Sequence, residues 1–136
     1  MTGGAGFIGS RLVDVLMTQG AHVTVFDNLT TGTLRNIRQW LNNPNLTFIK
    51  GNLLDPTELT KLKHNHYETI FHLAANPEVR VGSTNPNIHF QQNLVATHNL
   101  LEHACMCRIT KEMRAEILPY NPARVSVFLM TAAPNQ

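Results

Sequence analysis

A glycine-rich turn at the N-terminus is the first feature of this sequence that could do chemistry. Gly3, Gly6 and Gly9 recur at intervals of three within Thr2-Gly3-Gly4-Ala5-Gly6-Phe7-Ile8-Gly9. Residues without Cβ atoms let backbone N–H groups approach a diphosphate at the positive end of a helix dipole, and Gly9 permits close helix-to-strand packing. A glycine-rich turn that binds nothing has the same composition, so the pattern is weak by itself.

Asp27 strengthens the interpretation because it follows Gly3 by 24 residues and ends a predicted strand. An acidic residue at about this offset accepts hydrogen bonds from the ribose hydroxyls of a dinucleotide and repels a 2′-phosphate. No basic residue stands at Asn28 or Leu29. These positions predict NAD rather than NADP, with an ordinary strand-ending turn residue as the alternative for Asp27.

Alternating helices and strands are predicted around these two features. Apolar residues at helical spacing predict helices over 7–19, 34–41 and 87–107, and Pro56 behind the cap Asp55 predicts another. In the last helix the expected apolar members are Leu94, Leu100, Leu101 and Ala104. Apolar or β-branched runs predict strands over 22–26, 46–50 and 69–74, with a further candidate at 125–130. This alternation indicates an α/β domain with a parallel sheet.

Composition narrows the class of protein. A chain of 136 residues suits one domain, and 15% charged residues with 43% hydrophobic residues exclude disorder driven by charge. The net charge of +2 is carried by scattered basic residues, which argues against nucleic acid. The histidines and the two cysteines lack zinc-ligand spacing, so no metal site is predicted. Without a leader pattern or a long apolar run, we expect a soluble, cytoplasmic protein that binds no membrane.

Five segments follow one another in the order of a known family. They are TGGAGFIGS, VTVFDNLTTG, IKGNLLD, FHLAANP and QQNLVATHNLLEHA, and they cover residues 1 to about 105. The chain resembles the extended short-chain dehydrogenase/reductase family. Within that family it is most similar to the NAD-dependent sugar-nucleotide epimerases and dehydratases, the UDP-glucose 4-epimerases in particular.

The resemblance implies which residues bind the cofactor NAD. It places Gly3, Gly6, Phe7 and Ile8 at the diphosphate, Asp27 and Asn28 at the adenosine ribose, and Thr31 and Gly32 in a loop closing over the adenosine. It places Asn52 and Leu53 around adenine, Leu73, Ala74 and Ala75 beneath the nicotinamide ribose, and Asn93 on a helix facing the cofactor. The family usually has an acidic residue in place of Asn52, whose side-chain oxygen could still accept from the adenine amino group without charge assistance.

The catalytic pair of the family is missing. The family's chemistry needs a Tyr-x-x-x-Lys pair, whereas Tyr67 is followed by Phe71 at that spacing and Tyr120 by Arg124. No catalytic residue is therefore predicted, because a guanidinium that stays protonated cannot replace the lysine as a proton-shuttling partner. The family's apolar strand before the glycine turn is also missing, which would leave two strand edges unpaired.

These inferences combine into one expectation. The fold is a partial Rossmann-like doubly wound parallel sheet without its first strand, with an NAD-binding portion at 1–105 and a divergent C-terminal tail at 106–136. We expect the NAD-binding portion of a sugar-nucleotide epimerase or dehydratase, inactive as this chain. A nucleotide-sugar substrate and a possible homodimer belong to the intact relative. The alternatives are a non-catalytic nucleotide-binding module and a gene remnant without function.

Overall fold

A computed structural model describes residues 1–62, 67, 69–76, 78, 80, 84–106 and 126–129. The elements in chain order are α1 (Phe7–Thr18), β1 (Val23–Asp27), η1 (Leu34–Trp40), β2 (Leu46–Lys50), α2 (Pro56–Leu59), η2 (Thr60–Leu62), β3 (Thr69–His72), α4 (Pro86–His89), η3 (Phe90–Val95), α5 (Ala96–Met106) and β4 (Ser126–Leu129). The segments η1 and η2 are 3₁₀ helices, and η3 is a π-helix.

All strand pairs in the described part of the chain are parallel. β1 pairs with β2 from Val23 opposite Leu46 onward, and β3 pairs with β4 from Thr69 opposite Ser126 onward. Candidate strand 125–130 is thus confirmed as β4. The alternation of short strands with helices has produced the parallel sheet that the sequence predicted.

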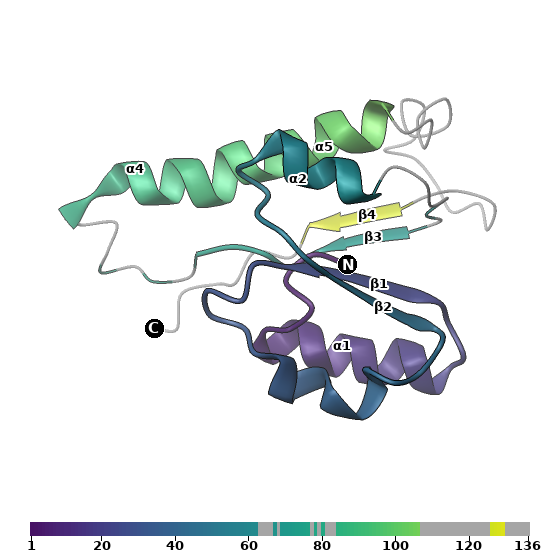
Figure 1. Ribbon diagram of the computed structural model, residues 1–136. Helices are drawn as coiled ribbons and strands as arrows, with labels where there is room; N and C mark the ends of the chain where they lie inside the picture. The colour runs from purple at the N-terminus through teal and green to yellow at the C-terminus, as the bar shows by residue number, and fades with distance from the viewer. Residues whose placement is uncertain are drawn as a thin grey trace.

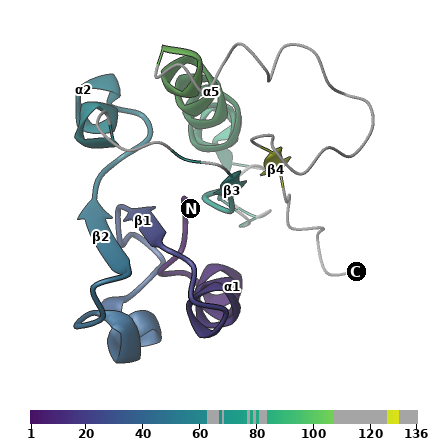
Figure 2. The same ribbon diagram turned by 90° about the vertical axis from the view of Figure 1, so that its right-hand side faces the viewer.

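Thr2 lies between the two strand pairs, where unpaired strand edges were expected. Thr2 forms parallel bridges to both Phe26 and His72, so it joins the two strand pairs in the order β2-β1-Thr2-β3-β4. The Thr2 N–H donates to the Phe71 carbonyl at 2.9 Å, and the Gly3 N–H donates to the Phe26 carbonyl at 3.0 Å. The expectation of two unpaired strand edges is therefore corrected at Thr2. Figures 1 and 2 show the N-terminus beside β1 and β3.

Helices cover both faces of the sheet, as a doubly wound fold requires. On one face α1 and η1 contribute Val13, Met17 and Ile37 to a core that includes Val23, Val25 and Leu46 of the strands. On the other face α2, η2 and α5 pack over Phe26 and Ile70. Figures 1 and 2 show these two layers on opposite sides of the strands. Among the helices described, none has the length and apolarity needed to cross a bilayer.

The longest predicted helix differs from the expectation. The stretch predicted as one helix over 87–107 is α4, the π-helix η3 and α5 in succession. Because a π turn holds more residues than an α turn, it shifts which side chains face the core. Leu100 and Ala104 are buried as predicted, whereas Leu94, inside η3, is 59% exposed. The 34–41 helix is likewise a 3₁₀ helix, ending at Trp40.

The buried N-terminal amine makes stability depend on pH. It donates to the Thr24 carbonyl at 2.6 Å, and burial lowers its pKa from 8.0 to about 6. His72 lies between the Thr2 and Thr97 hydroxyls, and burial first and the N-terminal charge second lower its pKa below 6.5. Both groups bind protons more readily in the unfolded chain, so both contributions to stability are present at high pH and are lost as the pH falls.

We expect the free energy of unfolding to be about 2 kcal/mol lower at pH 6 than at pH 8.5 because of the amine. Urea unfolding at the two pH values measures it. An N-terminally acetylated chain is the control, and most of the difference should disappear in it. A free energy of unfolding that is flat or higher toward pH 6 in the unmodified chain would contradict the burial of the amine.

Candidate functional site

A cleft of about 400 Å³ opens where the carboxyl ends of β1, β2 and β3 meet the start of α1. This is the edge at which open parallel sheets bind ligands, and the volume lies within the range of small-molecule sites. Ten of the predicted cofactor residues line the cleft: Gly3, Gly6, Asp27, Asn28, Thr31, Asn52, Leu53, Leu73, Ala74 and Ala75. The structure therefore gathers most of the predicted residues, from four separate segments, at one place.

The glycine turn is held tightly against the end of β3. Gly3 has a φ of +70°, and a Cβ on it would lie 2.6 Å from the Ala74 nitrogen. The Gly6 N–H donates to the Gly3 carbonyl at 3.1 Å, which closes the turn directly before α1. Only glycine meets both demands at position 3, a left-handed backbone and a close approach to another chain segment.

The first turn of α1 leaves donors without acceptors. Its N-cap residue, Gly6, has no side chain that could accept, and the N–H groups of Phe7, Ile8 and Gly9 have no acceptor among the residues described here. Such groups at a helix start bind anions. The side chains of Phe7 and Ile8, which are 83% and 53% exposed, do not line the cleft, so any contact with a ligand there is made by their backbone.

Asp27 ties the glycine turn to the end of β1. It is 7% exposed, and its Oδ2 accepts from the Ala5 N–H at 2.9 Å while Oδ1 accepts from the Leu29 N–H at 2.8 Å. Leu29 has a φ of +62°, which no sequence signal predicted. A carboxylate has about four acceptor positions. Asp27 can thus hold both amides and still present acceptors to the cleft.

The loop after Asp27 packs onto the glycine turn. Asn28 and Thr31 line the cleft, whereas Gly32 lies behind the loop against Ala5, where a Cβ would come within 2.8 Å of the Ala5 carbonyl carbon. The Thr33 N–H donates to the same Ala5 carbonyl at 3.0 Å. Gly32 therefore shapes this side of the cleft through packing and is not part of its lining.

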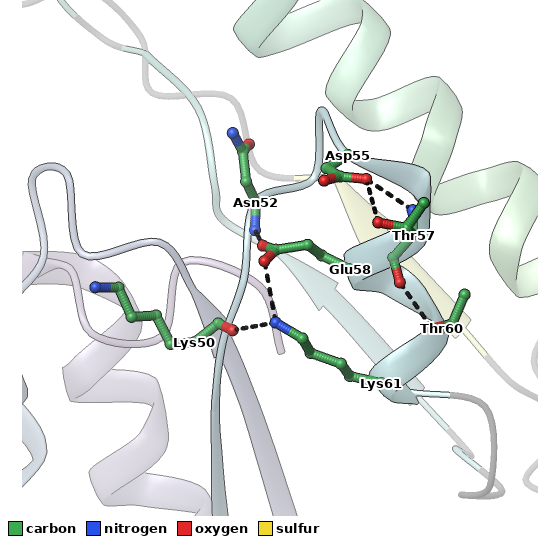
Figure 3. Close-up of polar contacts among 7 residues, drawn as sticks. All are labelled: Lys50, Asn52, Asp55, Thr57, Glu58, Thr60 and Lys61. Carbon is green, nitrogen blue, oxygen red and sulfur yellow. Dashed lines mark hydrogen bonds and ion pairs between the residues drawn. The ribbon is translucent and has the colours of Figure 1, made fainter.

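The loop after β2 is fixed by a network of polar contacts, drawn in Figure 3. The Asn52 N–H donates to Glu58 Oε2 at 2.6 Å, and Lys61 Nζ donates to Glu58 Oε1 and to the Lys50 carbonyl, both at 3.1 Å. The Asn52 N–H first and the Lys61 ammonium second hold the pKa of Glu58 below its ordinary value. Asp55 caps α2 by accepting from the Thr57 N–H at 2.9 Å. Asn52 is therefore held by the helix that follows it.

The side-chain oxygen of Asn52 has one partner that the sequence did not predict. This oxygen, which could accept from an adenine amino group, accepts from the Leu54 N–H at 3.0 Å. This bond forms a turn in which an Asn side chain binds the backbone two residues on. An asparagine at this position is compatible with such a turn but does not by itself indicate it.

The far side of the cleft is formed by the chain after β3 and by η3. Leu73, Ala74 and Ala75 line it as predicted, but Asn93 does not. Asn93 Oδ1 accepts from the Asn76 N–H at 2.7 Å, and Asn93 Nδ2 donates to the Asn76 carbonyl at 3.2 Å. Asn93 thus holds the loop in place. Eight lining residues were not predicted: Phe26, Thr30, Gly51, Leu54, Asn76, Ile88, Gln92 and Ala96.

Tyr67, the tyrosine among the described residues, does not line the cleft. Tyr67 lines a separate small cavity between β1, β3 and α5 and packs against the core on that face. Tyr120 and Arg124 lie outside the described residues.

The parallel sheet covered on both faces, with a glycine turn and an acidic strand end at its carboxyl edge, defines a Rossmann-type α/β domain. Comparison with known proteins identifies the family within that class. A model of the family described as GDP-mannose 4,6 dehydratase matches residues 1–117, and the chain belongs to this family.

Individual relatives match the same part of the chain. UDP-glucuronic acid decarboxylase 4 of Arabidopsis thaliana is 39% identical over 101 residues, which is 74% of this chain and 21% of that protein. UDP-glucose 4-epimerase of Mycolicibacterium smegmatis is 35% identical over 111 residues, 82% of this chain and 36% of that protein. The structure of Thermus thermophilus UDP-glucose 4-epimerase in complex with NAD matches with a TM-score of 0.70 and 34% identity, over 78% of this chain and 33% of that one. The chain therefore spans between about a fifth and about a third of the length of its relatives.

Proposed function

We propose that this chain binds NAD in the cleft and represents the cofactor-binding part, residues 1–105, of an enzyme that epimerises or dehydrates nucleotide sugars. The observation that carries the proposal is the convergence of the Gly3–Gly6 turn, the uncapped start of α1 and the Asp27 carboxylate at one edge of the sheet. The first two suit a diphosphate and the third suits ribose hydroxyls. The relative from Thermus thermophilus is described as a complex with NAD, which supports the same choice.

Each part of the cleft has a role in this proposal. The N–H groups of Phe7, Ile8 and the glycine turn would hold the diphosphate, and Asp27 with Asn28 would hold the adenosine ribose. Asn52 and Leu53 lie beside the base, with Thr31 and Gly32 closing the loop over the adenosine. Leu73, Ala74 and Ala75 lie beneath the nicotinamide ribose, and Asn93 supports that side through Asn76. Bound NAD would supply a hydride acceptor and donor.

Catalysis itself would need a Tyr-x-x-x-Lys pair, which the sequence of this chain does not contain. Positioned proton transfer is worth roughly 10² to 10⁴ in rate, and no tyrosine faces the cleft from the described residues. We therefore propose that the nucleotide sugar, the catalytic step and any homodimer belong to longer relatives. The tail 106–136 is proposed as a separate, divergent segment. A cytoplasmic location would suit two cysteines too close for a disulfide framework.

One NMR sample tests this proposal. NAD added to the ¹⁵N-labelled chain should shift the amide resonances of 3–9, 27–31 and 52–54, and should leave those of the outer face of α1, such as Val15, unchanged. UDP-glucose added next should not be converted to UDP-galactose above a no-enzyme control. Shifts confined to other residues would refute the cleft as the binding site. Turnover that disappears in Tyr120→Phe would show that the chain retains catalysis.

A further inference from the structure

Asn52 presents a hydrogen-bond donor to the cleft. Its Oδ1 is engaged by the Leu54 N–H at 3.0 Å, while no acceptor for its Nδ2 occurs among the described residues. The assignment of oxygen and nitrogen in this amide is determined by chemistry, because a backbone N–H can only donate and needs the oxygen. Rotating the amide would bring two donors together and leave the Leu54 N–H without a partner.

Polar contacts also fix the position of the Asn52 backbone. Its own N–H is anchored by Glu58, which Lys61 holds in turn, as Figure 3 shows. In that view the side chain of Asn52 extends away from Glu58 and Lys61. Asn52 is exposed and lines the cleft together with its neighbours Gly51, Leu53 and Leu54, beside the end of β1 where Asp27 stands. A nucleoside whose ribose meets Asp27 would place its base at this loop.

We propose that Asn52 determines the base specificity of the cleft, so that the chain accepts a 6-oxopurine dinucleotide at least as well as NAD. This inference rests on the proposed function. The 6-amino group of adenine is a donor and finds the donor Nδ2 opposite it, whereas a 6-oxo group is an acceptor and can pair with Nδ2. An acidic residue in the same turn would accept from Leu54 with one oxygen and offer the other to a 6-amino group.

Calorimetric titration of the full chain with NAD and with nicotinamide hypoxanthine dinucleotide tests the proposal. The two ligands differ at the 6-position of the purine and at the adjacent ring nitrogen. We expect the wild-type Kd for the hypoxanthine ligand to equal or lie below the Kd for NAD. In Asn52→Asp the preference should shift in favour of NAD by about tenfold or more. A site built to pair with one pattern of donors and acceptors strongly rejects a purine with the opposite pattern.

Asn43 provides a matched control. Its Oδ1 accepts from the Asn45 N–H at 2.9 Å in the same kind of turn, and it does not line the cleft. Asn43→Asp therefore adds the same charge and keeps the same turn, and the ratio of Kd values should not change. This control separates the local contact from a general effect of added negative charge on a dinucleotide.

The remaining outcomes distinguish two failures. If NAD binds and wild type prefers it to the hypoxanthine ligand by tenfold, or if Asn52→Asp leaves the ratio unchanged, the role given to Asn52 is wrong while the proposed function stands. If neither ligand binds to a folded chain, the proposed function is wrong and this inference fails with it.

Discussion

Gly9→Ala is expected to abolish or nearly abolish folding of the chain. A Cβ at position 9 would lie 2.8 Å from Gly4 Cα and closer still to the Gly3 carbonyl oxygen. Both neighbours are backbone atoms of the glycine turn, whose Gly3 N–H is bonded to the Phe26 carbonyl, so neither can move without distorting the turn. Severe overpacking costs about 3 kcal/mol or more, which is a large part of the stability of a small domain.

Urea unfolding followed by fluorescence measures this effect, since Trp40 is the single tryptophan and packs against the core beneath α1. The control is Gly20→Ala. Gly20 has a φ of +80° but open space where a Cβ would stand, so its replacement should cost only about 1 to 2 kcal/mol for the left-handed backbone. Equal losses in the two variants would mean that α1 does not pack as closely on the turn as described.

Asp27→Ala is expected to raise the Kd for NAD by a factor of 100 or more. The change removes the acceptors proposed for the ribose and also leaves the Ala5 and Leu29 N–H groups without a partner. A hydrogen bond to a charged group is worth about 1.5 to 3 kcal/mol. Losing two such bonds to the ribose therefore raises the Kd by more than a factor of about 100. Calorimetry with NAD gives the Kd, and urea unfolding gives the accompanying loss of stability.

Asp14→Ala separates the loss of stability from the loss of binding. Asp14 Oδ1 accepts from Gln39 Nε2 at 2.6 Å and from Trp40 Nε1 at 2.8 Å, outside the cleft. This variant should lose stability and keep its affinity for NAD. If Asp27→Ala bound NAD as tightly as Asp14→Ala does, the ribose contact assigned to Asp27 would be wrong.

Much of the fold was predictable because local signals agreed with it. The strand at 46–50 and the helix start at Asp55 and Pro56 lie where the sequence placed them. The strands predicted at 22–26 and 69–74 are found at Val23–Asp27 and Thr69–His72. Period-2 apolar runs and capping residues are short-range features, and a parallel sheet follows from their alternation.

What the sequence could not predict depends on contacts between distant segments. The bridging role of Thr2 needs Phe26 and His72 on either side of it, and the bond from Ala5 to Asp27 crosses 22 positions. The π-helix η3 positions the Asn93 side chain to bond to Asn76 and leaves Leu94 exposed. The spacing of apolar residues does not predict this π-helix. The direction of the Asn52 amide followed from one backbone N–H two residues on, a choice that residue type alone leaves open.

Calorimetric titration of the folded chain with NAD and with NADP tests the central claim most directly. The account predicts one NAD bound per chain and binding of NADP at least tenfold weaker, because the Asp27 carboxylate repels a 2′-phosphate and no basic residue stands at Asn28 or Leu29 to receive it. Tighter binding of NADP than of NAD, or no binding of NAD by a chain that is shown to be folded, would contradict it.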